Sequence, residues 1–167
     1  MVTIQKVIAK ISYYADKVSQ VMTILSLLFF FVAIFGGVLL RFVFKLPNSA
    51  MEDLTRTGFV WACFFAAAVA YKSMTLIRFR FFQEKFSENG QLVISIISDL
   101  LALSLALFLI VYGLQLTLQV WPSWQIGARI SKGYMYMALP ISMVFMTIHS
   151  VNFIFTDLCA LCSKEVK

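Results

Sequence analysis

The chain has 167 residues, of which 61% are hydrophobic and only 13% are charged, and its formal net charge at pH 7 is +6. Together with a mean hydropathy of +0.88, these values exclude a soluble domain and predict an all-α integral membrane protein. The hydrocarbon core of a bilayer is about 30 Å thick, so each spanning helix needs roughly 20 apolar residues at a rise of about 1.5 Å each.

Four apolar stretches meet that requirement, and they predict four transmembrane helices in a single membrane domain that covers residues 1–167. The first and the fourth carry no charge apart from His149. The second is the most difficult to assign as a spanning helix, because its uncharged part from Thr57 to Tyr71 covers only about 22 Å at helical rise, less than the hydrocarbon thickness. The predicted spans are residues 18–40, 51–73, 98–120 and 134–156.

The segment before the first span has apolar residues at helical spacing and lysines on the opposite face. This pattern is typical of an amphipathic helix that lies on the membrane surface. A second such helix is predicted in "TLIRFRFFQEKFSEN", between the second and third spans. For either segment, the alternative is an extension of the adjoining spanning helix.

Lysine and arginine residues are divided unequally between the two sides of the predicted bundle. The N-terminal segment, the connection between the second and third spans, and the C-terminal tail together hold nine, and the other two connections hold five. The positive-inside rule therefore predicts that both termini are cytoplasmic. Aromatic residues would then form a belt at the outer interface: Trp121, Trp124, Tyr134 and Tyr136.

The connection between the first two spans, within "RFVFKLPNSAMEDLTRTGFVW", concentrates charge in a chain that is otherwise nearly free of it. Pro47 disfavours helix just before it, and Ser49 with Glu52 fits a capping box, so the second helix is predicted to begin at Ala50. Carboxylates in that first turn are also favoured by the helix dipole. The short apolar core draws these charges toward the hydrocarbon, which makes four of them candidates for structural ion pairs or subunit contacts: Arg41, Glu52, Asp53 and Arg56.

Small residues recur at intervals of four along the second span, at Gly58, Ala62, Ala66 and Ala70. Such a stripe lets another helix approach closely in the membrane. A helix of a partner subunit and a helix of the same chain would both explain it.

The inventory of chemically active residues is poor. His149 is the only histidine, so a bis-histidine haem site cannot be built in one chain, and Cys159 with Cys162 supplies only two zinc ligands. We therefore expect no enzymatic activity, no cofactor and no nucleic-acid partner. His149 is expected to pack or hydrogen-bond with Asn152, one turn away, and Asp99 to reach headgroup water from the first turn of the third span.

The charged connection, the following "AYKSMTLIRFRFF" and the later "ISKGYMYMALPIS" together resemble the small membrane subunit (DctQ-like, Q subunit) of TRAP, or tripartite ATP-independent periplasmic, transporters. The resemblance covers about the whole chain, and its matches in the last span include Gly133, Tyr136 and Pro140. Where that family often has tryptophan, this chain has Ala50, and where the family often has histidine and aspartate it has Leu76 and Arg80. These departures prevent an assignment of substrate by subfamily.

The resemblance implies a multi-pass protein of the bacterial inner membrane. Its partners would be a large TRAP membrane subunit, a periplasmic substrate-binding protein and membrane lipids. The complex would import an organic acid, such as a C4-dicarboxylate, a keto acid or a sialic acid, together with sodium. The small subunit would scaffold the large one without binding substrate itself. The alternative is an autonomous small homo-oligomeric transporter or channel.

Overall fold

The computed structural model describes residues 2–46, 49–82 and 88–165, with side chains described over residues 7–46, 49–73 and 90–160. The helices of this part follow one another as α1 (Val2–Phe42), α2 (Ser49–Phe82), α3 (Glu88–Val120), α4 (Gly133–Tyr136) and α5 (Ala138–Glu165). Within it, four helical stretches are long and apolar enough to cross a membrane: Val7–Phe42, Ser49–Ser73, Gly90–Val120 and Gly133–Ala160. Each predicted span lies inside one of these stretches, so the prediction of an all-helical protein with four membrane-spanning helices is confirmed.

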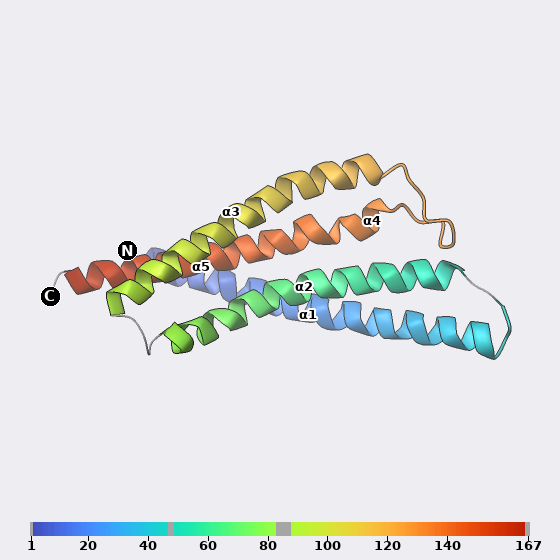
Figure 1. Ribbon diagram of the computed structural model, residues 1–167, viewed down its shortest axis with the longest axis horizontal. Coiled ribbons are helices and arrows are strands. Elements are labelled where there is room, and N and C mark those ends of the chain that lie inside the picture. Colours follow the sequence, from blue (N-terminus) through green and yellow to red (C-terminus); the bar gives the residue numbers. More distant parts are fainter. Residues whose placement is uncertain (1, 47–48, 83–87, 166–167) are drawn as a thin grey trace.

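The helices are arranged as two hairpins that lie side by side (Figure 1). The α1 helix packs along α2, and α3 packs along α5, while α5 also contacts both α1 and α2. Both termini lie at one end of the bundle, and the α1–α2 connection lies at the other end with the loop between α3 and α4 (Figure 1). We refer to these as the terminal end and the loop end, because the cytoplasmic placement of the termini stays a prediction.

The α1 helix runs without a break through the segment predicted as a separate surface helix. It has 41 residues, which gives a length of about 62 Å, or roughly twice the hydrocarbon thickness. Ser12, Ala15 and Ser19 are buried, so this part of α1 packs against the bundle. The structure therefore has the alternative arrangement, in which this segment is an extension of the first spanning helix and not a separate surface helix. The α2 helix likewise continues to Phe82, and the rest of the second predicted surface helix falls partly in residues 83–87, outside the described residues.

The interior is built mainly from small residues, while large apolar side chains cover the outside. Among the described side chains, most of the buried apolar residues are alanines, and Phe65 in α2 is the large aromatic residue that is fully buried. Because lipid provides no hydrophobic drive between helices, close backbone packing is the main attraction left to such a bundle. Gly58 is an example, since a Cβ atom there would lie 2.7 Å from Phe29 Cδ1 and 3.2 Å from Phe30 Cα.

A break at Met137 separates the short helix α4 from α5. Pro140 is the third residue of α5, a position in the first turn where a proline is tolerated because its missing N–H has no intrahelical partner to lose. Its ring lies near α3, where a Cβ atom on Gly113 would be 3.4 Å from Pro140 Cδ and 3.2 Å from Leu139 Cδ2. This close contact fixes the α3–α5 hairpin near the loop end.

Candidate functional site

At the loop end, the carboxylate of Asp53 holds the loop that joins α3 to α4. Its Oδ2 atom accepts hydrogen bonds from the backbone N–H groups of Gly127 (2.9 Å) and Ala128 (3.2 Å). Gly127 passes so close to the start of α2 that a Cβ atom there would lie 2.3 Å from the carbonyl group of Ser49. Glycine is therefore required at this position for the loop to reach Asp53.

Two further hydrogen bonds join the same face of α2 to the α3–α4 loop and to α4. Gln125 donates from Nε2 to the hydroxyl of Thr57 (3.3 Å), which itself donates to the backbone carbonyl of Asp53 (2.9 Å). Trp61 donates from its indole N–H to the carbonyl of Tyr134 (2.9 Å). Asp53, Thr57 and Trp61 are spaced by four residues, so they form one polar row along the first turns of α2. We call these three residues and their partners the loop clasp.

The remaining predicted charges point elsewhere. Arg41, Glu52 and Arg56 are exposed, and they lie on the rim of an open groove of about 460 Å³ between α1 and α2. Among the described side chains, the ion pair that forms is the one between Lys72 and Asp16, and none joins Asp53 to either arginine. Contacts of these charges with a partner subunit stay a prediction. The α2 helix begins at Ser49, one residue before the predicted start.

The small-residue stripe divides between two surfaces. Gly58 and Ala62 are buried in the bundle, whereas Ala66 and Ala70 are exposed. The reason is geometric: an interval of four residues overshoots a turn of 3.6 by about 40°, so a strict four-residue repeat rotates out of any straight interface. The buried face of α2 instead continues through Phe65, Ala68 and Tyr71.

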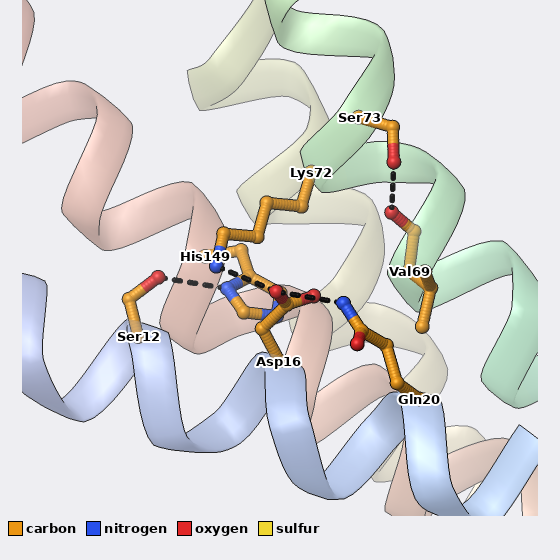
Figure 2. Close-up of polar contacts among 7 residues, drawn as sticks. All are labelled: Ser12, Asp16, Gln20, Val69, Lys72, Ser73 and His149. Atoms are coloured by element: carbon orange, nitrogen blue, oxygen red, sulfur yellow. Dashed lines mark hydrogen bonds and ion pairs between the residues drawn. The ribbon is translucent and has the colours of Figure 1, made fainter.

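At the terminal end, charged and polar side chains from α1, α2 and α5 meet inside the bundle, as Figure 2 shows. The ammonium group of Lys72 lies 2.9 Å from Asp16 Oδ2, which also accepts a hydrogen bond from Gln20 Nε2 (3.0 Å). Beside this pair, Ser12 Oγ and His149 Nδ1 are 2.9 Å apart. His149 has no exposed surface in the bundle. The ion pair between Lys72 and Asp16 neutralises both charges, which lowers the free-energy cost of burying them.

A second group of bonds joins α2, α3 and α5 at the same end. The hydroxyl of Tyr71 donates to Asp99 Oδ1 (2.8 Å) and lies 3.0 Å from Ser150 Oγ, which in turn donates to the backbone carbonyl of Asp99 (2.9 Å). Asp99 is only 1% exposed. We call this group, together with Ser12, Asp16, Lys72 and His149, the terminal polar cluster.

Two sequence-based predictions are wrong here. The described partner of the His149 side chain is Ser12 of α1, 137 positions away along the chain, and not Asn152. Asp99 is enclosed by α2 and α5 and does not face headgroup water, because α3 begins at Glu88 and so places Asp99 three turns inside the helix. The sequence shows Tyr71 at the end of the second apolar stretch and Asp99 at the start of the third. It does not show that the two side chains bond, because their pairing depends on how the hairpins dock.

The family motif in the last span maps onto the packing of the loop end. Gly133 lies against Trp121, and a Cβ atom there would be 2.3 Å from the indole ring. Its backbone N–H donates to Ser131 Oγ (3.1 Å), which donates to the carbonyl of Trp121. Tyr136 ends α4 and is partly buried, and Pro140 opens α5.

Cys63 of α2 is a free thiol on the surface of the chain, and Cys159 is a free, partly buried thiol. The side chain of Cys162 lies outside those described. Where side chains are described, His, Cys, Asp and Glu form no cluster of three that could hold a metal ion.

Comparisons with known proteins agree with the family resemblance. A family model described as "Tripartite ATP-independent periplasmic transporters, DctQ component" matches residues 30–160. A "Putative TRAP transporter small permease protein" of Haemophilus influenzae is 24% identical over 103 residues, which are 62% of this chain and 63% of that protein. The chain thus aligns with under two thirds of the length of this curated relative.

Proposed function

Because this chain belongs to the DctQ component family of tripartite ATP-independent periplasmic transporters, we propose that it is the rigid scaffold of such a transporter in the bacterial inner membrane. In this proposal it binds a large membrane subunit and helps to position a periplasmic substrate-binding protein. The complex imports an organic acid with sodium, and the small subunit binds no substrate itself. Its own role is to stay fixed while part of the large subunit moves.

The observation that supports this role best is that polar contacts join the two hairpins at both ends. The loop clasp joins α2 to the α3–α4 loop, and the terminal polar cluster joins α1 and α2 to α3 and α5. Hydrogen bonds in a medium of low dielectric constant are costly to leave unmade. A bundle joined in this way at both ends resists sliding of one hairpin against the other, as a scaffold requires.

The large subunit is proposed to pack on the exposed face of α2. Elsewhere on the bundle the exposed residues are mostly large and apolar, but this face of α2 carries small ones. They recur at helical spacing, which places them on one side of the helix and allows a second helix to approach. This face consists of Cys63, Ala66, Ala67, Ala70 and Ser73.

Reconstitution in liposomes with an imposed sodium gradient tests the scaffold role. The chain, the large subunit and the binding protein are tested singly and together, with a labelled C4-dicarboxylate, a keto acid and a sialic acid offered in turn. We expect uptake when all three proteins are present and none from this chain alone. Sodium-dependent uptake by this chain alone would replace the scaffold with an autonomous homo-oligomeric transporter.

A further inference from the structure

The groove between α1 and α2 has two chemically different parts. The part farther from the loop end, which we call the floor, is lined by apolar and aromatic residues that include Phe30, Ile34, Val38 and Phe59. Its rim at the loop end carries Arg41, Glu52 and Arg56. The volume of about 460 Å³ is within the range of about 300–1,000 Å³ that small-molecule sites occupy. A ligand that fits must therefore be amphiphilic, with a polar group at the loop end and an apolar body along the helices.

The length of the groove matches one leaflet of a bilayer. Phe30 and Arg41 are eleven residues apart on α1, which is about 16 Å at helical rise and about half of a hydrocarbon core of about 30 Å. Phe30 and Phe59 are the lining residues farthest from the loop end; their rings are 5.6 Å apart, and Gly58 beside them packs against Phe29. A helix that crosses both leaflets would not be accommodated in a groove that ends halfway.

The exposed residues that follow Arg41 favour a position of the rim at the membrane boundary over one in bulk water. Directly after Arg41, the chain exposes a run of large apolar side chains, and the guanidinium of Arg41 lies 5.9 Å from the ring centroid of Phe42. Such residues must be covered by lipid or protein. The exposed apolar residues of this run are Phe42, Val43, Phe44 and Leu46.

The charges of the rim favour a phosphate group. Arg41 and Arg56 have no ion-pair partner among the described side chains, and with Glu52 they give the rim a net charge of +1. Arginine binds phosphate through paired, charge-assisted hydrogen bonds. We propose that the groove binds one phospholipid, with its phosphate between Arg41 and Arg56 and an acyl chain along the floor, and that it prefers anionic phosphatidylglycerol to phosphatidylcholine.

Native mass spectrometry of the full chain in mild detergent tests this site, with phosphatidylglycerol or phosphatidylcholine of identical acyl chains added. We expect one retained phosphatidylglycerol, and Arg41→Gln and Arg56→Gln each to weaken its binding by about tenfold through a lost charge-assisted hydrogen bond. Val38→Trp fills the floor without a change of charge, and it should abolish retention of phosphatidylglycerol. Glu52→Gln should strengthen binding, because it removes a like charge from beside the phosphate.

Arg129→Gln and Lys132→Gln are matched controls, because they remove the same charge from the loop end away from the groove, and they should leave binding unchanged. Circular dichroism confirms that each variant keeps its helices. Equal retention of phosphatidylglycerol by the wild type, Arg41→Gln and Val38→Trp would overturn the proposal. So would efficient cross-linking of a Val38→Cys variant to the large subunit in native membranes, since a protein would then occupy the groove. The proposal requires only that the chain spans the membrane, so it stands or falls independently of the scaffold role.

Discussion

Asp53 shows how one side chain can be assigned the wrong kind of partner from sequence alone. In the sequence it stands beside Glu52 and close to Arg56, which suggests an ion pair. In the structure its carboxylate instead accepts two backbone N–H groups from a loop 74 and 75 residues away. The two adjacent carboxylates therefore have different environments: Asp53 faces the loop clasp, and Glu52 faces the groove.

We predict that Asp53→Ala lowers the thermal stability of the chain in detergent, because it leaves two backbone donors of the α3–α4 loop without their acceptor. The cost should be about 1–3 kcal/mol, or a shift of several degrees in the unfolding temperature. Asp53→Asn keeps an acceptor oxygen and should lose roughly half as much. The shift is measured by thermal unfolding followed by circular dichroism.

Glu52→Ala is the matched control for Asp53→Ala, since it removes a neighbouring exposed carboxylate that contacts no loop. It should change the unfolding temperature little. If Glu52→Ala destabilised the chain as much as Asp53→Ala, the capping of α2 and not the loop clasp would explain both effects.

At the scale of the helices, the sequence predicted where spans occur better than where helices end. Long charge-free runs fix the positions of the spans, because a bilayer allows few alternatives for them. The extension of α1 to Val2 depends on the burial of Ser12, Ala15 and Ser19 against the bundle, which no periodicity of apolar residues reveals. A serine and alanine face looks polar in a sequence but packs well in a membrane.

The contact between α1 and α2 depends on Gly58, and we predict that Gly58→Ala destabilises the bundle. An added methyl group would meet the side chain of Phe29 at 2.7 Å and the backbone of Phe30 at 3.2 Å, and backbone cannot move aside cheaply. Overpacking of this kind typically costs about 1–3 kcal/mol. The measurement is again the unfolding temperature in detergent.

Gly36→Ala provides the comparison, because its new Cβ would lie 3.9 Å from the sulfur of Met51, an ordinary van der Waals distance. Alanine is also favoured over glycine inside a helix by about 0.5–1 kcal/mol. Gly36→Ala should therefore be neutral or stabilising. Similar losses from both variants would indicate that α1 and α2 pack as tightly at Gly36 as at Gly58, which contradicts the structure.

At the scale of the whole molecule, composition and four apolar runs were enough to predict the fold class, but not how the hairpins dock. The bonds that join the hairpins connect residues far apart in sequence, such as Ser12 with His149 and Trp61 with Tyr134. Each of these residues has an ordinary explanation by itself: a surface serine, a packed histidine, an interfacial tryptophan. Only the docked arrangement makes them partners.

We predict that Ala66→Leu weakens assembly with the large subunit, because it places a branched side chain on the exposed small-residue face of α2. The chain itself should remain folded, since Ala66 is exposed. The measurement is the recovery of the large subunit when this chain is affinity-purified from detergent extracts.

Ser104→Leu makes the same kind of enlargement at an exposed position of α3, and it should leave recovery of the large subunit unchanged. If Ala66→Leu and Ser104→Leu both gave wild-type recovery, the exposed face of α2 would not be the subunit interface. If Ser104→Leu alone reduced recovery, the interface would lie on the α3 side of the bundle.

The distribution of polar contacts between the hairpins also has a consequence for biogenesis in the bilayer. Asp16 and Lys72 neutralise each other within the first hairpin, so this pair needs no partner from the second hairpin when α1 and α2 enter the lipid. Asp99 and His149, in contrast, have described partners on helices of the first hairpin, namely Tyr71 and Ser12. We therefore expect co-translational insertion to be ordered, with the first hairpin serving as the template on which the second completes its hydrogen bonds.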